Sequence, residues 1–453
     1  MSNLVITDCT LETVPGLEIR IANGLIAEIG RSVSRGSEEV LNAEGNDIIP
    51  GLCDHHIHLH ALAARRTSVE CGPPFVHNAT ELAAALHNSF DTHGWVRGVG
   101  YFESVAGDLD REHLDHLHRA NPVRIQHRSG ALWILNTAGI QATGLLQSDH
   151  PGVERDSDGI PTGRVWRADA WLRDRIPSNA PPSLATVGSE LAALGITSVT
   201  DATPDLDSKG ITSISAAMSK GDLPQRVHLL GAPIGSSHFS DRLTVGPYKI
   251  VLADSGLPDL EELARTITLC HRSRRAIAAH SVSRETLLIL LAALNDVGSI
   301  PGDRIEHGAL IPAEVIEEIR RLGLTVVTQP GFIADRGDDY LAHVAPTDIG
   351  DLYRCRSLLD SSVPVAFSSD APYGPIDPWA NIAAAQDRRT RKGFTLGGYE
   401  TVDFGRALNA YLSSPGNPGG PARRIQVGTP ADLVIVPRGH RPSATIINGK
   451  RVH

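Results

Sequence analysis

The sequence predicts an α/β fold, a (β/α)8 TIM barrel that carries a small additional β domain. Three observations lead to this prediction. Short apolar segments alternate with helical patterns along the middle of the chain, polar residues typical of catalysis follow several of these segments, and both chain ends are rich in strand patterns. The length of 453 residues also suits a barrel with an accessory domain.

Both ends of the chain carry alternating apolar segments. Near the amino terminus, Asn23-Gly24 separates two of them, which is a strong signal for a β-hairpin. Residues 432–436 and 445–452 give strand patterns near the carboxyl terminus. We expect residues 1–50 and 420–453 to form one small β-sandwich domain, and residues 51–419 to form the barrel.

The middle of the chain gives eight strand patterns with helical patterns between them. This alternation indicates βαβ units and a parallel sheet, and spacings of roughly 20–40 residues fit a (β/α)8 barrel. The predicted strands are residues 48–57, 195–201, 226–231, 247–252, 275–280, 303–307, 324–328 and 363–369.

One connection is much longer than a barrel helix needs. Residues 60–194 separate the first two predicted strands and hold strand and helix patterns of their own. Insertions at the carboxyl ends of barrel strands lie over the active site. We therefore expect about residues 60–194 to form a cap that supplies one wall of a pocket.

Composition excludes several classes of protein. A net charge of −10 argues against a nucleic-acid or anionic-membrane partner. Five scattered cysteines without a C-x-x-C pair fit a reducing cytoplasm better than a disulfide framework or a thiolate zinc site. Neither a leader pattern nor an apolar run approaching about 18 residues is seen, so we expect a cytoplasmic protein without a membrane span.

Candidate metal ligands follow the predicted strands. His56 and His58 stand two residues apart at the end of the first strand, so their side chains share one face, and His55 points to the other. This pair alone is a weak signal, because histidines also pack in cores. The pattern becomes specific because four more strand ends carry similar residues. These are Lys249, His280, His307 and Asp370.

The residue types suit a metal site. Neutral imidazoles bind divalent ions. Lys249 is one of only five lysines, and an ammonium inside a barrel is costly unless it is neutralised, paired with a carboxylate, in contact with substrate, or modified. Asp370 can bind a metal and take a proton from its water, with a loop-capping role as the alternative.

These stretches together resemble the amidohydrolase superfamily, in the branch of YtcJ-like and N-substituted formamide deformylase-like enzymes (amidohydrolase family 3). The resemblance covers essentially the whole chain. The matching stretches are residues 50–59, 158–163, 195–201, 304–308, 329–330, 369–372 and 428–433.

The resemblance implies a metal-dependent hydrolase. One or two Zn²⁺ ions are expected, with Mn²⁺, Co²⁺ or Fe²⁺ as alternatives, and a carbamate on Lys249 would bridge two ions. The implied reaction is cleavage of a C–N bond of a small molecule (an amide, cyclic amide, formamide, urea or carbamate) by a metal-bound hydroxide, with Asp370 as the proton shuttle. The implied ligands are His56, His58, Lys249, His280, His307 and Asp370.

Other residues receive expectations around this centre. Asp54 is expected to orient the histidine pair, and Glu306 to point away from His307 in a structural role. Relatives often carry a histidine where Ala131 stands, which suggests a more apolar pocket here. The residues expected to contact substrate are Arg128, Trp133, Arg167, Tyr248 and Gln329.

Several alternatives stay open at this point. The chain can be a deaminase with a mononuclear site, a decarboxylase or isomerase on the same fold, or a scaffold without catalysis, since one fold hosts many chemistries. A homodimer or larger homo-oligomer is also open.

Overall fold

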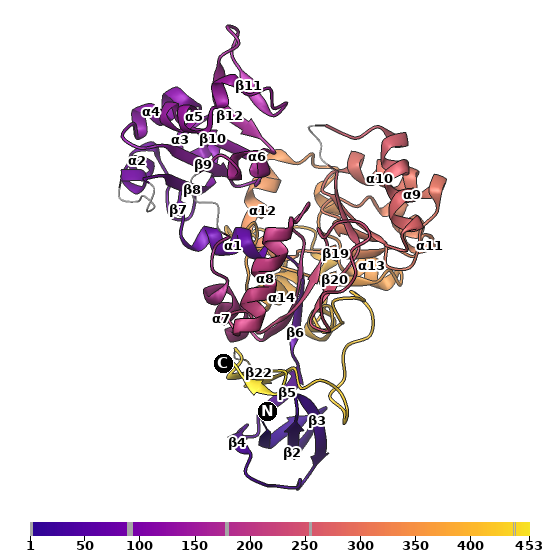
Figure 1. Ribbon diagram of the computed structural model, residues 1–453. Coiled ribbons are helices and arrows are strands. Elements are labelled where there is room, and N and C mark those ends of the chain that lie inside the picture. Colours follow the sequence, from indigo (N-terminus) through magenta and orange to yellow (C-terminus); the bar gives the residue numbers. More distant parts are fainter. Residues whose placement is uncertain (1–2, 88–93, 177–180, 253–255, 438, 440) are drawn as a thin grey trace. The chain divides into compact units, whose positions relative to one another are not determined.

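The computed structural model describes residues 3–87, 94–176, 181–252, 256–437, 439 and 441–453 (Figure 1). Contacts divide the chain into two compact units: a main unit, Met1–Leu59 with Ser183–His453, and an inserted unit, His60–Pro182. The inserted unit ends before the predicted limit near residue 194, because helix α7 (Ala185–Ala193) packs on strand β13 of the main unit. Its function as a cap stays a prediction.

Both ends of the chain contribute to one eight-stranded sheet. The order is β23-β22-β21-β5-β1-β2-β3, with β4 paired to β1. The predicted hairpin is confirmed, because Ala22 pairs with Leu25 and both turn residues, Asn23 and Gly24, have positive φ. A sandwich arrangement stays a prediction. The strands are β1 (Leu4–Leu11), β2 (Val14–Ala22), β3 (Leu25–Gly30), β4 (Glu39–Asn42), β5 (Asp47–Pro50), β21 (Leu433–Val436), β22 (Ala444–Ile447) and β23 (Lys450–Arg451).

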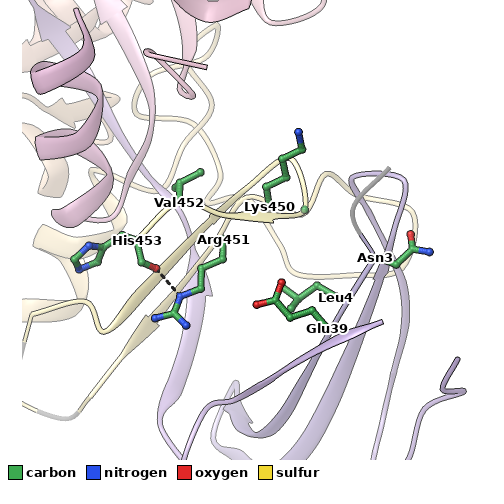
Figure 2. A pocket seen from close by; sticks show the side chains of 8 residues that line it. Asn3, Leu4, Glu39, Lys450, Arg451, Val452 and His453 are labelled. Atoms are coloured by element: carbon green, nitrogen blue, oxygen red, sulfur yellow. Dashed lines mark hydrogen bonds between the residues drawn. The ribbon is translucent and has the colours of Figure 1, made fainter. Parts of the chain in front are cut away.

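A hollow of about 480 Å³ lies beside the edge strand β23 (Figure 2). Lys450 and Arg451 line it together with Glu39, and all three side chains are exposed. Charged side chains on an edge strand discourage pairing with another chain. The charged residues that line this hollow therefore protect the edge of the sheet from pairing with another chain.

Parallel strands form two further sheets of the main unit, in the orders β15-β14-β13-β6 and β16-β17-β18-β19-β20. Each of the eight predicted strands overlaps one of them, whereas β15, just before the fourth predicted strand, was not predicted. The strands are β6 (Leu52–Ile57), β13 (Ile196–Asp201), β14 (Arg226–Leu229), β15 (Leu243–Val245), β16 (Tyr248–Val251), β17 (Ile277–Ser281), β18 (Arg304–His307), β19 (Thr325–Thr328) and β20 (Val365–Phe367).

The two parallel sheets meet at both of their edges. On one side β15 continues into β16 through Gly246 and Pro247, and proline has no N–H for a ladder. On the other side the Asp370 N–H donates to the His56 carbonyl at 2.8 Å, just beyond β20. This strand order is that of a (β/α)8 barrel. No continuous ladder joins β20 to β6 in the described part of the chain, so a closed barrel stays a prediction.

The first predicted strand, residues 48–57, is two strands in the structure. β5 pairs with β21 in the terminal sheet, whereas β6 pairs with β13. Gly51 separates them, and a Cβ atom there would lie 2.1 Å from the Thr197 Cγ2 atom. The backbone at residue 51 therefore approaches Thr197 so closely that only glycine fits at this position.

Helices of the main unit follow most of the parallel strands, and several begin with a side-chain cap. Asp207 accepts from the Gly210 N–H, and Ser283 forms a capping box with Thr286. No helix among the described residues is long and apolar enough to cross a bilayer. The helices are α8 (Ser208–Lys220), α9 (Leu260–Arg272), α10 (Arg284–Val297), α11 (Ile316–Arg321), α12 (Gly331–His343), α13 (Arg356–Asp360), α14 (Pro378–Asp387) and α15 (Phe404–Asn409).

The inserted unit has its own six-stranded sheet, in the order β11-β12-β10-β9-β8-β7. Apolar side chains such as Val123, Ile125 and Ile134 fill its core. Its strands are β7 (Val69–Glu70), β8 (Val96–Tyr101), β9 (Val123–His127), β10 (Leu132–Leu135), β11 (Val153–Arg155) and β12 (Pro161–Trp166). Its longer helices are α2 (Ala79–His87), α4 (Arg111–Leu117) and α5 (Thr137–Thr143).

Candidate metal centre

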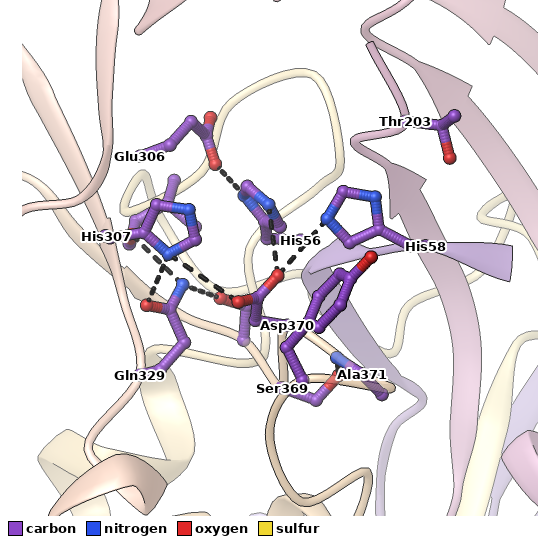
Figure 3. Close-up of polar contacts among 12 residues, drawn as sticks. His56, His58, Thr203, Glu306, His307, Gln329, Ser369, Asp370 and Ala371 are labelled. Atoms are coloured by element: carbon purple, nitrogen blue, oxygen red, sulfur yellow. Dashed lines mark hydrogen bonds and ion pairs between the residues drawn. The ribbon is translucent and has the colours of Figure 1, made fainter. Parts of the chain in front are cut away.

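A cluster of potential metal ligands lies at the carboxyl ends of the parallel strands (Figure 3). His56 lies near the end of β6, His307 ends β18, and Asp370 follows β20. In the described part of the chain, these three residues offer ligand atoms that all lie within 4.8 Å of one another. Strand ends that are distant in sequence thus bring two imidazoles and a carboxylate together.

Asp370 lies between three imidazoles. Its Oδ1 atom is 3.2 Å from His58 Nε2 and 3.5 Å from His56 Nε2, and its Oδ2 atom is 3.9 Å from His307 Nδ1. Oδ1 is buried and has no hydrogen-bond partner within the described structure. Such an oxygen is costly to leave unpaired, and a cation held among the imidazoles would satisfy it.

The carboxyl group of Asp370 is ionised. Burial alone would raise its pKa, but the facing imidazoles of His307, His58 and His56 hold that pKa well below its ordinary value. An ionised carboxylate is the form that binds cations.

Two of these residues have a backbone conformation that favours glycine. The φ angles of His307 and Asp370 are 69° and 54°. For residues with a side chain, this left-handed conformation costs free energy, so the surrounding structure must hold both residues in it. The turn at His307 also redirects its side chain relative to the regular alternation of β18.

Lys249 and His280 lie next to this cluster. Lys249 Nζ is 3.3 Å from His56 Nε2, and the ring centroids of His280 and His307 are 4.5 Å apart. Burial lowers the pKa of the Lys249 amine to about 8, although nearby carboxylates, first Glu306, oppose this shift. All six residues predicted as ligands are therefore brought together.

Most of the imidazoles are neutral. Burial holds the pKa values of His56 and His280 well below the ordinary value and lowers that of His307, and in each case nearby cationic groups add to this effect. Neutral imidazole is the form that binds a divalent ion. The donor set of nitrogen and carboxylate oxygen thus fits a first-row metal such as zinc.

Glu306 contacts the ring of His56, a contact that the sequence did not predict. Its Oε2 atom contacts His56 Nδ1, and its Oε1 atom accepts from Arg304 Nε. Alternation along β18 predicted that Glu306 points away from His307, yet both side chains approach the His56 ring, because the backbone at His307 is left-handed. The signal in the sequence was Arg304, which stands two residues before Glu306 and therefore on the same face of β18.

Asp54 was expected to orient the histidine pair, and its hydrogen bonds go to a backbone N–H of that pair and to Ser369. It accepts hydrogen bonds from the Ser369 N–H at 3.0 Å, from the Ser369 hydroxyl, and from the His56 N–H at 3.2 Å. Asp54 therefore holds the backbones that carry His56 and Asp370. His55 points to the other side of β6, as the alternation predicted, with its Nε2 atom 3.1 Å from Ser413 Oγ.

Two predicted substrate contacts in the main unit have other partners. Gln329 is 1% exposed, its Oε1 atom is 3.0 Å from His307 Nδ1, and its amide donates to Ser368 Oγ. It thus orients a candidate ligand. Tyr248 adjoins Lys249 in β16, so it faces the opposite side, where the Arg275 guanidinium is 5.4 Å from its ring. This position favours a packing role for Tyr248.

Three predicted substrate contacts belong to the inserted unit. The Arg128 guanidinium lies 3.3 Å from the Phe102 ring centroid. Trp133 is buried, and its indole N–H donates to Asp169 at 2.9 Å. Arg167 is exposed, with a φ of 52°. Their contacts with substrate stay predictions.

A family model described as the amidohydrolase family matches residues 39–453. The chain belongs to the amidohydrolase family. This amidohydrolase is 23% identical to the N-substituted formamide deformylase of Arthrobacter pascens, with 98% of this chain and 95% of that protein covered. It is 22% identical to the putative amidohydrolase YtcJ of Bacillus subtilis, with 78% and 75% covered.

A solved structure has the same fold. It is an uncharacterised metal-dependent hydrolase from Pyrococcus horikoshii, which aligns with a TM-score of 0.76 at 20% identity over 97% of this chain and 100% of that one. The family identifies the chain as a hydrolase acting on carbon–nitrogen bonds other than peptide bonds. Together with the His56, His307 and Asp370 cluster, it supports a divalent metal ion.

Proposed function

We propose that this amidohydrolase cleaves an amide, cyclic amide, formamide, urea or carbamate bond of a small molecule. The reaction would take place at the carboxyl ends of a closed (β/α)8 barrel, with the inserted unit as its cap. One observation carries the proposal: the ionised Asp370 carboxylate faces three imidazoles and keeps one buried oxygen without a hydrogen bond.

The proposed ligands are His56, His58, Lys249, His280, His307 and Asp370, around one or two Zn²⁺ ions, with Mn²⁺, Co²⁺ or Fe²⁺ as alternatives. When bound, such an ion supplies Lewis acidity, which lowers the pKa of a water molecule and polarises the substrate carbonyl. Proton transfer and the holding of the ion would be carried out by side chains of the protein.

Asp370 would move the proton. Its carboxylate accepts a proton from the attacking water as the new C–O bond forms. It then gives that proton to the leaving nitrogen as the C–N bond breaks, and the carboxylate returns to its ionised state. The low pKa of Asp370 means that the carboxylate is ionised when each turnover begins, and only the ionised form can accept a proton.

Lys249 would carry a carbamate that bridges two ions. The neutral amine attacks CO₂, a new N–C bond forms, and one proton is lost to solvent. Burial supports this reaction, because a pKa of about 8 leaves a larger neutral fraction at physiological pH than an ordinary lysine has.

A substrate screen in ¹⁸O-water tests the proposal. Protein loaded with Zn²⁺, Co²⁺ or Mn²⁺ is offered N-substituted formamides first, because one relative is named for that reaction, and then cyclic amides, ureas and carbamates. We expect amine release with one solvent oxygen in the carbonyl product. Product without solvent oxygen would refute hydrolysis and favour decarboxylation or isomerisation.

Metal analysis provides the second arm of the test. We expect His58→Ala to lose metal and turnover, whereas His343→Ala, at an exposed position on α12, keeps both. A wild-type chain without bound metal after loading in the presence of bicarbonate would refute the metal centre.

A further inference from the structure

A second cavity, of about 860 Å³, lies at the opposite ends of the parallel strands. Arg304 and Thr325 begin β18 and β19, Pro364 directly precedes β20, and all three line it. The candidate metal centre lies at the carboxyl ends of these same strands, so the two sites are separate.

The wall of this cavity is basic. Among its lining residues none is Asp or Glu, whereas five are Arg or His. The basic lining residues are His228, His238, Arg274, Arg275 and Arg304. A concave surface with one sign of charge attracts ligands of the opposite charge.

Arg304 presents an unused donor at the inner wall. Its side chain is 1% exposed, its Nε atom donates to Glu306, and its Nη2 atom is 3.5 Å from the His55 carbonyl. The Nη1 atom is buried and has no hydrogen-bond partner within the described structure. An unpaired guanidinium nitrogen in such a place is costly, and an anion offsets the cost.

His228, on β14, presents a second buried nitrogen without a hydrogen-bond partner among the described residues. Its Nδ1 atom is 2.7 Å from the Thr244 hydroxyl, while its Nε2 atom is buried without a hydrogen-bond partner. Burial and the cationic groups of Arg304, His238 and Arg275 lower its pKa to about 3, so the ring is neutral. The Thr244 hydroxyl can donate to the Val227 carbonyl at 3.5 Å or to His228 Nδ1 at the shorter distance. When it donates to Nδ1, Nε2 carries an N–H that can be donated to an anion.

Arg275 adds a fixed buried charge. Its guanidinium donates to the carbonyls of Gly246, Ala232, Pro233 and Leu230. These carbonyls satisfy its hydrogen bonds but carry no full negative charge to balance it. The cavity therefore contains more buried positive charge than the single Glu306 carboxylate on Arg304 neutralises.

We propose that this cavity binds a small oxyanion, such as phosphate, bicarbonate or a short carboxylate, with Arg304 and His228 as donors and Arg275 as the fixed charge. Arg274 and His238, which are exposed, form its basic rim. Planar, forked guanidinium groups suit oxyanions in particular. This site is additional to the hydrolytic centre, and Glu306 connects the two, because it contacts both Arg304 and His56.

Calorimetric titration of the metal-loaded, full-length protein tests the proposal. Sodium phosphate, bicarbonate and formate are compared at constant ionic strength, adjusted with sodium chloride. We expect saturable binding of at least one of them, and the tightest of the three identifies the source of the oxyanion. Absence of saturable binding for all three would overturn the proposal.

Variants locate the binding. Arg274→Glu reverses a charge at the rim and should weaken binding roughly tenfold, and His228→Phe should weaken it by a similar factor because it removes a donor but keeps a ring. Arg272→Glu, an exposed position on α9 outside the lining, is the matched control and should bind normally. Equal affinity in the wild type, Arg274→Glu and His228→Phe would overturn the proposal.

A crystal soak distinguishes this cavity from the metal centre. Arsenate replaces phosphate, and its anomalous peak should lie beside Arg304 Nη1. A peak at the metal centre alone, with none in the cavity, would overturn the proposal even if the titration shows binding.

Discussion

His56 Nδ1 contacts Glu306 Oε2, although 250 positions separate the two residues in the chain. Both side chains are fully buried. A carboxylate at this position holds the imidazole ring in place and keeps its proton on Nδ1, which leaves Nε2 for a metal ion. The orientation of the first proposed ligand on β6 thus depends on a residue of β18.

The Glu306→Gln substitution tests this dependence. We expect metal affinity to fall about 10–100-fold, because the ring loses the charge that orients it. Stability should also fall, because Arg304 keeps a buried charge without its carboxylate. Chelator competition measures the first effect and urea unfolding the second. Glu317→Gln, at an exposed position, is the control, and unchanged metal affinity in Glu306→Gln would contradict the orienting role.

Asp370→Asn separates proton transfer from metal binding. The amide keeps the shape of the side chain and one oxygen donor but cannot accept a proton, so we expect turnover to fall by about 10²–10⁴-fold while most metal is retained. Turnover is measured with the best substrate from the screen, and metal by elemental analysis. Asp360→Asn, on the surface beside Arg406, should behave as wild type. Near-normal turnover in Asp370→Asn would exclude the shuttle.

The Lys249 carbamate should depend on pH in a defined direction. The pKa of this lysine is lowered from 10.5 to about 8, so the amine is protonated below pH 8 and neutral above it. At a fixed concentration of dissolved CO₂, labelling with ¹³C should therefore become faster as pH rises from 7 to about 9 and then level off. A ¹³C NMR signal that is absent in Lys249→Arg and present in Lys220→Ala would assign it. No signal in the wild type would exclude the carbamate.

The junction between β5 and β6 should not tolerate a larger residue. In Gly51→Ala the new Cβ atom would meet the Thr197 side chain at 2.1 Å, so the strands must separate. We expect a loss of at least about 1–3 kcal/mol in the free energy of unfolding. Gly256→Ala is the control, because nothing lies within 4 Å of a Cβ there. Similar unfolding midpoints for both variants would contradict this prediction.

Sequence patterns predicted the parallel strands well, because a buried strand consists of a short run of apolar residues that is visible in the sequence. The positions near Ile196, Ile277 and Arg304 begin strands as expected. The six residues proposed as ligands also lie close together in the structure, since strand order places their ends side by side, and their binding of a metal stays a prediction. The break at Gly51 was missed, because strand periodicity does not show where a strand changes its partner.

Contacts between distant side chains were harder to predict. The partner of His56 is Glu306, whereas alternation favoured Asp54, because the two strands that carry His56 and Glu306 are not neighbours in either sheet. Gln329 was expected to contact substrate, which stays a prediction. The sequence did not show its contact with His307, a residue with a left-handed backbone. Side-chain direction at strand ends depends on such turns, which local patterns do not encode.

The left-handed conformations of His307 and Asp370 have a consequence for folding. Each costs the native state about 1–3 kcal/mol, so we expect the loops after β18 and β20 to open locally more readily without metal than with it. A bound ion would hold both residues in place, so it would stabilise the folded state in addition to its role in the reaction. Amide hydrogen exchange in these two loops should then slow when metal is added, before any substrate is present.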